Sequence, residues 1–360
     1  MPNEHNAPAN PVAQTSLSPD RRAMLAGIGG LAAGALFLSA RSAQAGPLEP
    51  PDGPVASTGK TTQEIFDKVA AVESRTAINS ANTPGTATSL FKITQPGSYY
   101  LTGNITGEAG KHGIEIASHG VTLDLNGFEL LGVSGSLDGI NASVQLLNNI
   151  AVLNGSVRFW GGDGVDLAIN SATNCRLEGL LAANNGGIGI SSGLNSLVTR
   201  CIGFANGDHG ISAGDGSTIL NCSAISNQNS GIAVSRDSMV LDCVSRRNTV
   251  NGIRCVYQNV IRGNSCCRNG LQGNGAGIRA LNTANRIEGN TCIEQTRGIE
   301  VNSNGSIIIR NICRGNDTNW VIAAGNAYGP IVATPAGAAV NGNTAAAALG
   351  STDPNANFSY

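Results

Sequence analysis

Residues Asn206 to Cys255 have the sequence NGDHGISAGDGSTILNCSAISNQNSGIAVSRDSMVLDCVSRRNTVNGIRC, in which one phrase is repeated. A Gly-Ile pair recurs every 21 residues, at Gly210, Gly231 and Gly252. Cysteines follow the same period, at Cys201, Cys222 and Cys243. A period in the twenties with β-branched residues leaves no room for a long helix. It therefore predicts a β-solenoid, in which each repeat forms one coil.

The repeat continues on both sides of this stretch. Gly followed by Ile or Val occurs at Gly113, Gly139, Gly164, Gly187, Gly210, Gly231, Gly252, Gly277 and Gly298. The gaps range from 21 to 26 residues, as loops of variable length between strands of constant length would produce. The recurring glycine fits a bend that needs a positive φ or a close approach of two backbones.

After each glycine, apolar and mostly polar residues alternate, which predicts a strand with one face inward. The first predicted inward column is Ile114, Ile140, Val165, Ile188, Ile211, Ile232, Ile253, Ile278 and Ile299. The second is Ile116, Ala142, Leu167, Ile190, Ala213, Val234, Cys255, Ala280 and Val301. The outward column between them is Glu115, Asn141, Asp166, Gly189, Ser212, Ala233, Arg254, Arg279 and Glu300.

A second strand follows in each repeat, as in TILNC, MVLDC and NRIEGN. Asn264, Asn290 and Asn311 occupy one position of this phrase. In stacked coils about 4.8 Å apart, these side chains would form a ladder, each amide oxygen binding a backbone N–H of the neighbouring coil. We expect roughly nine to ten coils.

The phrases NxxIxGNxC…GI and NCxxxxNxxxGI resemble the parallel β-helix repeat of the pectate-lyase-like superfamily, over about Gly97 to Asn316. The resemblance implies an all-β, right-handed, single-stranded parallel β-helix with three sheets. Its implication for function is broad, because lyases, hydrolases, epimerases, tailspikes, adhesins and accessory proteins share this fold.

The flanking segments predict export. In residues 1–45, Arg21-Arg22 precede an apolar run that ends at Ala43-Gln44-Ala45, a small-residue cleavage site. The pattern resembles a twin-arginine signal peptide, although Asp20 stands where Ser or Thr is usual. A retained membrane anchor is the alternative. With the signal cleaved, we expect a periplasmic or secreted monomer without a membrane span.

The rest of the chain divides into four further segments. Residues 46–60 are a Pro/Gly-rich linker, and 61–90 are an N-terminal cap with a short helix. Thr61 and Glu64 would form its capping box, and the helix would cover the first strand edge. Residues 91–317 are the parallel β-helix. Residues 318–360 are an irregular C-terminal cap and tail.

Charge is sparse and unevenly distributed. Charged residues make up 13% of the chain, and the net charge of −2 excludes a generally basic nucleic-acid binder. Residues 46–235 carry 8 Lys/Arg and 15 Asp/Glu, whereas residues 236–314 carry 11 Arg and 5 Asp/Glu. One end of the stack is therefore acidic and the other arginine-rich.

All nine cysteines lie between Cys175 and Cys313, inside the repeat. Zinc-type CxxC spacing is absent. Their recurrence predicts free, buried packing residues. Disulfides between neighbouring coils are the alternative, since coil spacing falls within the allowed Cα separation.

The acidic end contains the first candidate site. Its candidate catalytic residues are Asp163, Asp166, Asp208 and His209, with His209 as base or acid. Glu115, Asp138 and Asp166 form a candidate calcium set, because neighbouring carboxylates repel one another unless a cation joins them. The family resemblance also implies acidic calcium ligands and a general base on this outer face. The alternative is that these residues only form turns.

The arginine-rich end contains the second candidate site. Arg236, Arg254 and Arg279 could bind carboxylates or sulfates of an acidic polysaccharide. Trp160, beside the acidic cluster, could stack on a sugar ring, or else cover the solenoid. The alternative for the arginines is a ladder of ion pairs, such as Arg262 with Glu288 and Arg268 with Glu294.

These features predict an exported protein that binds or processes an acidic polysaccharide, with catalysis left open. One alternative is a polysaccharide lyase or glycoside hydrolase acting through the acidic cluster. Another is a structural or adhesive envelope protein. An accessory protein of copper-enzyme maturation would require a Met/His cluster that is absent. Gly207-Asp208-His209-Gly210 resembles the polygalacturonase histidine motif, but Glu288 follows Arg286-Ile287 where that family has Lys.

Overall fold

The computed structural model describes residues 61, 64, 74–270, 273–333 and 352–360. The chain divides into two units after Asp67, and the solenoid belongs to the second unit. The predicted signal peptide and linker lie outside the described residues. Of the predicted cap helix, only Thr61 and Glu64 are described. They exchange the capping-box hydrogen bonds, from Thr61 N to Glu64 Oε2 (2.9 Å) and from Glu64 N to Thr61 Oγ1 (3.2 Å).

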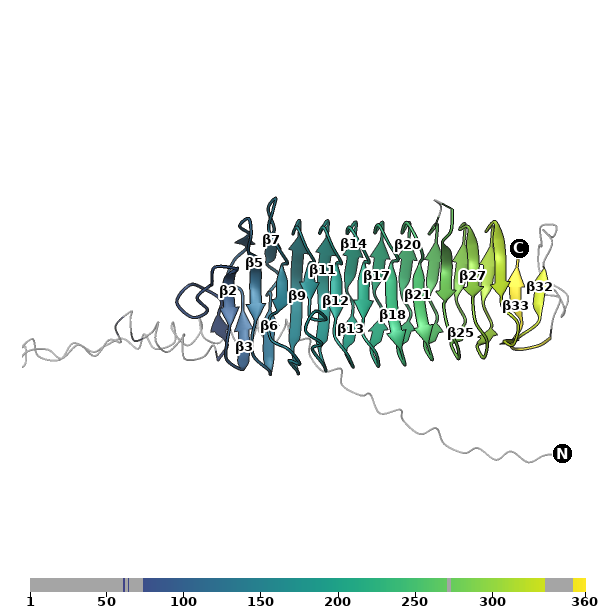
Figure 1. Cartoon of the computed structure of the whole chain (residues 1–360), viewed down its shortest axis with the longest axis horizontal. Helices are drawn as coiled ribbons and strands as arrows, with labels where there is room; N and C mark the ends of the chain where they lie inside the picture. The colour runs from purple at the N-terminus through teal and green to yellow at the C-terminus, as the bar shows by residue number, and fades with distance from the viewer. Residues whose placement is uncertain (1–60, 62–63, 65–73, 271–272, 334–351) are drawn as a thin grey trace, which may run out of the picture. The chain divides into compact units, whose positions relative to one another are not determined.

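The solenoid consists of stacked coils whose parallel strands line three faces (Figure 1). Face 1 is an 11-stranded sheet in which each strand pairs with its equivalent in the next coil. Its strands are β2 (Ser89–Ile93), β5 (His112–Ile116), β8 (Ile140–Ala142), β10 (Val165–Asp166), β12 (Ile190–Ser192), β15 (Ile211–Ala213), β18 (Ile232–Arg236), β21 (Ile253–Tyr257), β24 (Ala276–Ala280), β27 (Arg297–Val301) and β30 (Thr318–Ile322).

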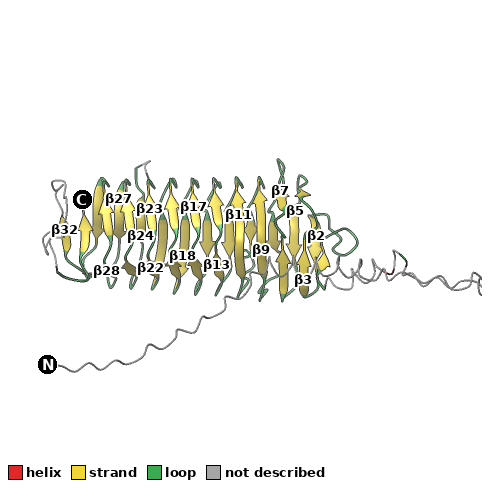
Figure 2. Cartoon of the chain, turned by 180° about the vertical axis from the view of Figure 1, so that it is seen from behind, coloured by secondary structure: helices red, strands yellow, loops and turns green. Residues whose placement is uncertain are grey.

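Faces 2 and 3 form one 22-stranded sheet, because β9 (Ala151–Arg158) and β11 (Arg176–Ala183) run through both. Face 2 also contains β1 (Thr76–Ala77), β3 (Gly97–Tyr100), β6 (Val121–Asp124), β13 (Leu197–Thr199), β16 (Thr218–Leu220), β19 (Met239–Leu241), β22 (Val260–Arg262), β25 (Arg286–Glu288), β28 (Ile307–Ile309) and β31 (Ala327–Tyr328). Face 3 contains β4 (Ile105–Thr106), β7 (Glu129–Leu131), β14 (Ile202–Phe204), β17 (Ser223–Ile225), β20 (Val244–Arg246), β23 (Ser265–Cys267), β26 (Thr291–Ile293), β29 (Ile312–Arg314), β32 (Ile331–Ala333) and β33 (Asn357–Ser359). Figure 2 shows these strands from behind, joined by short bends.

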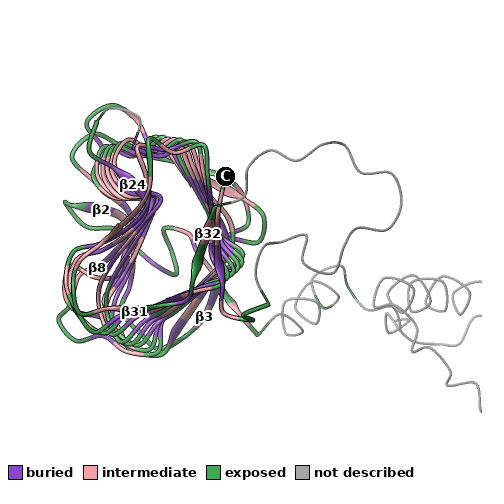
Figure 3. Cartoon of the chain, turned by 90° about the vertical axis from the view of Figure 1, so that its right-hand side faces the viewer, coloured by how far each residue is buried: buried purple, intermediate pink, exposed green. Residues whose placement is uncertain are grey.

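The core lies inside the coils, where Figure 3 shows the buried residues gathered. Ile211, Ile232 and Ile253 pair in register along face 1 and are fully buried. The predicted inward column is therefore confirmed at its centre. Residues one period apart in the sequence become neighbours in adjacent coils.

The predicted register is wrong in the coil that contains Gly187. Val165 pairs with Ile190, and Ile190 pairs with Ile211, so Ile190 belongs to the first inward column and Ile188 does not. Ser191 is then the outward residue of that coil, and Ser192 takes the second inward position. A shift of two residues keeps the alternation of inward and outward positions, so the pattern alone does not distinguish the two registers.

The parallel pairing extends one coil beyond the predicted C-terminal end of the β-helix at residue 317, whereas on face 1 it starts within two residues of the predicted residue 91. At the C-terminal end, where an irregular cap was expected, β30 pairs in register with β27 and places Trp320 beside Ile299. Asn319 stands there in place of the glycine that marked the other repeats. At the other end, β2 begins at Ser89 and pairs with β5. Face 1 therefore has 11 strands, compared with the nine to ten coils expected.

The recurring glycine is required by a close approach of backbones. A Cβ at Gly139 would lie 2.6 Å from the carbonyl oxygen of Gly164, and one at Gly164 would lie 2.5 Å from that of Gly189. Neither residue has a positive φ. Any larger residue would push neighbouring coils apart.

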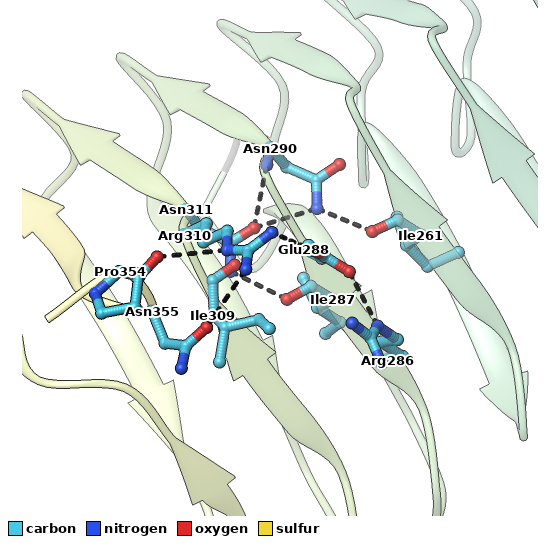
Figure 4. Close-up of polar contacts among 10 residues, drawn as sticks. All are labelled: Ile261, Arg286, Ile287, Glu288, Asn290, Ile309, Arg310, Asn311, Pro354 and Asn355. Atoms are coloured by element: carbon cyan, nitrogen blue, oxygen red, sulfur yellow. Dashed lines mark hydrogen bonds and ion pairs between the residues drawn. The ribbon is translucent and has the colours of Figure 1, made fainter.

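The predicted asparagine ladder is confirmed at the bend between faces 2 and 3. Asn264 N donates to Asn290 Oδ1, and Asn290 N donates to Asn311 Oδ1, both at 2.9 Å. Figure 4 shows Asn290 and Asn311 with these bonds. Each side-chain Nδ2 also donates to a backbone carbonyl, as Asn290 does to Ile261 O at 2.8 Å. Buried polar groups at the bend are thus paired from coil to coil.

All nine cysteines are free and eight are buried, as predicted. Three of them extend the same ladder toward the N-terminus. Cys201 N lies 3.4 Å from Cys222 Sγ, and Cys222 N lies 3.4 Å from Cys243 Sγ. Cys243 N then donates to Asn264 Oδ1 at 2.9 Å. These thiols occupy the positions that asparagine side chains take in the later coils.

Candidate functional site

Two aspartates form a short ladder at the bend that leads into face 1. Asp163 N donates to Asp138 Oδ1, and Ile188 N donates to Asp163 Oδ1, both at 2.7 Å. Glycine makes room for each carboxylate: a Cβ at Gly162 would lie 2.2 Å from Asp138 Oδ1, and one at Gly187 would lie 2.0 Å from Asp163 Oδ1. The local sequence therefore directs both carboxylates onto the backbone of the following coil.

The two carboxylates have opposite electrostatic environments. Burial and the charges of Asp166, Asp138 and Asp208 raise the pKa of Asp163 to about 7, although the hydrogen bond from Ile188 N–H lowers it. Burial also acts on Asp138, but hydrogen bonds from His112 and Asp163 N–H lower the pKa of Asp138 below its usual value. Near neutral pH, Asp163 therefore exchanges a proton while Asp138 stays ionised.

His112 explains the difference between the two aspartates. Its Nδ1 lies 3.1 Å from Asp138 Oδ2, in the coil before Asp138. Asp163 has no such neighbour, because in this column it is preceded by Asp138 and followed by Ile188. Among the described residues, Asp163 Oδ2 has no hydrogen-bond partner, so it remains free to face a ligand.

The candidate calcium set is not assembled. Glu115 binds Lys92, with Oε1 2.7 Å from Nζ. Asp166 Oδ1 accepts hydrogen bonds from the backbone nitrogens of Ala168 (3.0 Å) and Ile169 (3.1 Å), which close a turn. Within the part of the chain that the structure describes, no three His, Cys, Asp or Glu side chains are placed to hold a metal ion. The prediction that Glu115, Asp138 and Asp166 share a cation is therefore not supported.

The predicted catalytic residues fall into two places on face 1. Asp163 and Asp166 belong to the coil of β10, whereas Asp208 and His209 precede β15, two coils further on. Two coils correspond to roughly 10 Å. His209 Nδ1 lies 3.2 Å from Ser230 N, and burial, reinforced by the charge of Arg254, lowers the pKa of His209. A neutral His209 could accept a proton from a ligand. Because it lies two coils from Asp163, the two side chains cannot act on the same atom of that ligand.

A shallow hollow of about 210 Å³ lies on face 1 beside His209. Its floor consists of small side chains, and Arg254 stands at one end. It is lined by His209, Ser212, Ala213, Ala233, Val234, Ser235, Arg254 and Val256. Arg254 is half-buried and has no acidic partner among the described residues. The hollow therefore combines a floor of small residues with one cation that has no acidic partner among the described residues.

The register of face 1 places this hollow inside a longer outward column. Neighbours in the column are paired strand by strand, in the order Asp166, Ser191, Ser212, Ala233, Arg254, Arg279 and Glu300. Three coils of small uncharged residues thus separate the carboxylate of Asp166 from the guanidinium of Arg254.

The other two predicted arginines are already engaged. Arg279 Nε lies 3.4 Å from Glu300 Oε2, which also binds Arg297 at 3.1 Å. Arg236 is exposed, and its guanidinium lies over the ring of Tyr257, 5.3 Å from the centroid. Of the three, only Arg254 lines the hollow.

One of the two predicted ion pairs on the other faces is formed. Arg268 binds Glu294. Arg262 lies in register with Glu288, but Glu288 binds two other arginines. Figure 4 shows Glu288 between Arg286 (2.7 Å) and Arg310 (3.0 Å). Among the described residues, five of the 11 arginines in residues 236–314 are therefore paired with carboxylates: Arg268, Arg279, Arg286, Arg297 and Arg310.

Trp160 does not bind a ligand from the surface, which corrects the prediction that it stacks on a sugar. Its side chain is 1% exposed, and its Nε1 donates to Leu130 O at 3.1 Å. Its ring fills the space beside Gly113, where an added Cβ would lie 2.8 Å from it. Trp160 is a core residue.

Three residues of the site were missed by the sequence analysis. Ser191 was missed because the register of its coil was misassigned. His112 and Lys92 were missed because their partners, Asp138 and Glu115, are 26 and 23 residues away. These separations are one coil length, so the same period that aligned the inward columns could have found them.

This chain is similar to known proteins in its fold and not in its sequence. No protein-family model and no curated protein matches the sequence. The A-module of mannuronan C-5 epimerase AlgE6 from Azotobacter vinelandii superimposes with a TM-score of 0.52 at 15% identity, over 83% of this chain and 94% of that one.

This chain has the parallel β-helix fold of that module. The AlgE4 A-module of the same organism gives a TM-score of 0.49 at 15% identity, covering 72% of this chain and 88% of that chain. Pectate lyase Pel9A gives 0.41 at 16% identity, covering 64% and 65%. Within the described residues, no helix is long and apolar enough to cross a membrane.

Proposed function

We propose that this β-helix binds an acidic polysaccharide along face 1, with Arg254 as its carboxylate contact. The observation that carries the proposal is the hollow in which Arg254, without an acidic partner among the described residues, stands over a floor of small side chains. A half-buried guanidinium beside such a floor matches the needs of a uronate, whose carboxylate accepts two parallel hydrogen bonds and whose ring needs flat, uncrowded surface.

The shared fold supports this proposal. The AlgE6 module, by its name, acts on mannuronan, which is a uronic acid polymer. Its fold extends over most of this chain. A shared fold does not by itself imply a shared function. The charge and shape of face 1 are the features of this chain that support the proposal.

The test measures binding of uronate-containing oligosaccharides by calorimetry, with and without Arg254→Gln. A charged hydrogen bond contributes about 1.5–3 kcal/mol, so we expect Arg254→Gln to weaken binding by about tenfold or more. Arg262→Gln is the matched control, because Arg262 is exposed on face 2 and the change removes the same charge. Equal affinities for the wild type and Arg254→Gln would refute the proposal.

A second candidate function is glycoside hydrolysis through Asp163. The observation that favours it is the pair of neighbouring carboxylates with pKa values moved apart: raised to about 7 for Asp163 and lowered for Asp138. A protonated Asp163 could donate to a glycosidic oxygen while an ionised carboxylate stabilises the opposing charge. Release of reducing ends that is lost in Asp163→Asn would establish it. Binding without cleavage would leave the binding function alone.

We propose that the chain is exported before it meets such a ligand. The argument is the arginine pair at Arg21-Arg22, the apolar run that follows, and the small residues at Ala43-Gln44-Ala45. Mass spectrometry of the protein recovered from the expressing cell's exterior or periplasm would show a mature N-terminus at Gly46. Recovery of the full-length chain in the membrane fraction would favour a retained anchor.

A further inference from the structure

Two basic side chains line the hollow on face 1. Arg254 lies on β21, and His209 precedes β15, which is two coils earlier in the stack. The remaining residues that line the hollow are uncharged. An anion in the hollow therefore meets two basic side chains and no carboxylate among the lining residues.

The backbone of the next coil leaves Nε2 of His209 available to a ligand. His209 Nδ1 lies 3.2 Å from both the nitrogen and the carbonyl oxygen of Ser230. It accepts the Ser230 N–H when the ring is neutral and donates to the carbonyl oxygen when the ring is protonated. Nε2 has no hydrogen-bond partner among the described residues, since Asp208 Oδ1, 4.0 Å away, accepts a hydrogen bond from Asn229 Nδ2 at 2.7 Å. In both protonation states, Nε2–H therefore remains free to donate to a ligand.

The surroundings of His209 favour a neutral ring in the free protein. Burial lowers the pKa of His209 and the charge of Arg254 lowers it further, although Asp208 and the Ser230 carbonyl raise it. The preceding coil contacts His209 through the backbone of Gly189, which carries no charge. A carboxylate in the hollow would offset the charge of Arg254 and accept a hydrogen bond from Nε2–H. Both effects favour the protonated ring.

Resting on the proposed function, we propose that His209 is a second anion-binding residue of the hollow and takes up a proton when Arg254 binds a uronate. The proton is bound in the complex and not in the free protein, so the affinity rises as the pH falls between the two pKa values of His209, in the complex and in the free protein. At higher pH the ring is neutral in both states, and the affinity no longer depends on its titration. The hollow is thus an anion site that strengthens in acid.

The experiment measures binding of an oligogalacturonate to the full chain by calorimetry between pH 8 and pH 5.5, a range in which the uronate stays ionised. We expect the affinity of the wild type to rise by about tenfold over this range, because hydrogen bonds to a charged donor are roughly twice as strong as neutral ones. Titrations near pH 6 in two buffers with different ionisation enthalpies should show net proton uptake on binding.

His209→Asn removes the titrating ring and keeps an oxygen that can accept the Ser230 N–H. It should reduce the pH dependence to within about twofold and abolish the proton uptake, and it should weaken binding more at pH 5.5 than at pH 8. His119→Asn is the matched control, because His119 Nδ1 also lies 3.2 Å from a backbone nitrogen of the next coil, that of Asn148, but His119 does not line the hollow. It should behave as the wild type. Circular dichroism confirms that each variant is folded.

Asp163 requires an arm of its own, because its pKa is raised to about 7 and it lies two coils before His209. Loss of its negative charge at low pH would also favour an anion on face 1. Asp163→Asn removes that titration. The variant should keep the proton uptake of the wild type, and adding His209→Asn to it should abolish the uptake.

The outcomes separate the two proposals. Binding that Arg254→Gln weakens, but whose pH dependence is the same in the wild type and in His209→Asn, overturns the role of His209 and leaves the proposed function standing. Proton uptake that is lost in Asp163→Asn and kept in His209→Asn overturns that role as well. Absence of binding, or indifference to Arg254→Gln, overturns both proposals.

Discussion

Two bends of the solenoid use the same hydrogen bond with different chemistry. Between faces 2 and 3, Asn264, Asn290 and Asn311 accept a backbone N–H from the neighbouring coil through a neutral amide. At the entrance to face 1, Asp138 and Asp163 do so through a carboxylate. An amide side chain accepts the backbone N–H through its oxygen and donates a further hydrogen bond through its nitrogen. A carboxylate accepts the same backbone N–H but adds a negative charge. The hydrogen bond to Ile188 N–H does not by itself require the charge of Asp163, since asparagines at the same bend accept backbone N–H groups through a neutral amide.

Removing one amide from the ladder should produce the largest effect. Asn290→Ala leaves Asn264 N without its side-chain acceptor, removes one of the two acceptors of Asn264 Nδ2, and removes the Nδ2 group that donates to Ile261 O. Each buried group left unpaired costs about 1–3 kcal/mol, so we expect a loss of about 3 kcal/mol or more in the free energy of unfolding. Urea denaturation measures it. Asn302→Ala, an exposed control, should change stability by less than about 0.5 kcal/mol; similar losses in both would mean that the ladder contributes nothing special.

Removing the charge of Asp163 should stabilise the folded protein, whereas removing the amide of Asn290 should destabilise it. Because the folded pKa of about 7 exceeds the ordinary value of 3.8, ionisation opposes folding, and stability falls as the pH rises from about 4 to 7. Asp163→Asn should therefore stabilise the protein at pH 8, by about 1–2 kcal/mol once solvent exposure is allowed for, and leave it unchanged below pH 4. Thermal unfolding across this range measures the gain. A destabilised variant at pH 8 would show that Asp163 is as structural as Asn290.

Replacing a cysteine of the ladder with asparagine should increase the stability of the protein. Cys243 Sγ approaches Leu241 O (3.1 Å) and Ile219 O (3.7 Å), the equivalents of the carbonyls that Asn311 Nδ2 contacts, Ile309 O and Ile287 O. Cys243→Asn should thus gain about 0.5–1 kcal/mol. Cys267→Asn, outside the ladder, should gain nothing. A loss at position 243 would show that the bend is too narrow there for an amide.

The smallest effect is expected at Asp138. Hydrogen bonds from His112 and Asp163 N–H hold its pKa below 3.8, so its contribution to stability is present above that pH and is lost as the pH falls through the folded pKa. Asp138→Asn should cost about 0.5 kcal/mol at pH 7 and nothing near pH 2. Thermal unfolding at the two pH values would reveal it. A gain at pH 7, as at Asp163, would mean that His112 does not stabilise the carboxylate.

Most of the fold follows from the 21- to 26-residue period, because a solenoid turns sequence separation directly into spatial neighbourhood. The central inward column, the amide ladder and the free thiols could all be predicted on that basis. The alternation of apolar and polar residues was less informative about register. In the coil of Gly187, a shift of two residues left every residue on a plausible side, and the error hid Ser191 from the floor of the candidate site.

Outside the coil of Gly187, the sequence alone determined which residues stack on face 1, since the period supplies that without any knowledge of side-chain packing. Only the tertiary structure decided what the stacking does. Burial of Trp160 depends on the space left by Gly113 in another coil, and the proton affinity of Asp163 depends on carboxylates from three coils combined with loss of solvent. The isolation of Arg254 likewise depends on which neighbours Glu300 engages. Each of these properties depends on residues from several coils and on solvent exposure. A repeat pattern specifies neither of these.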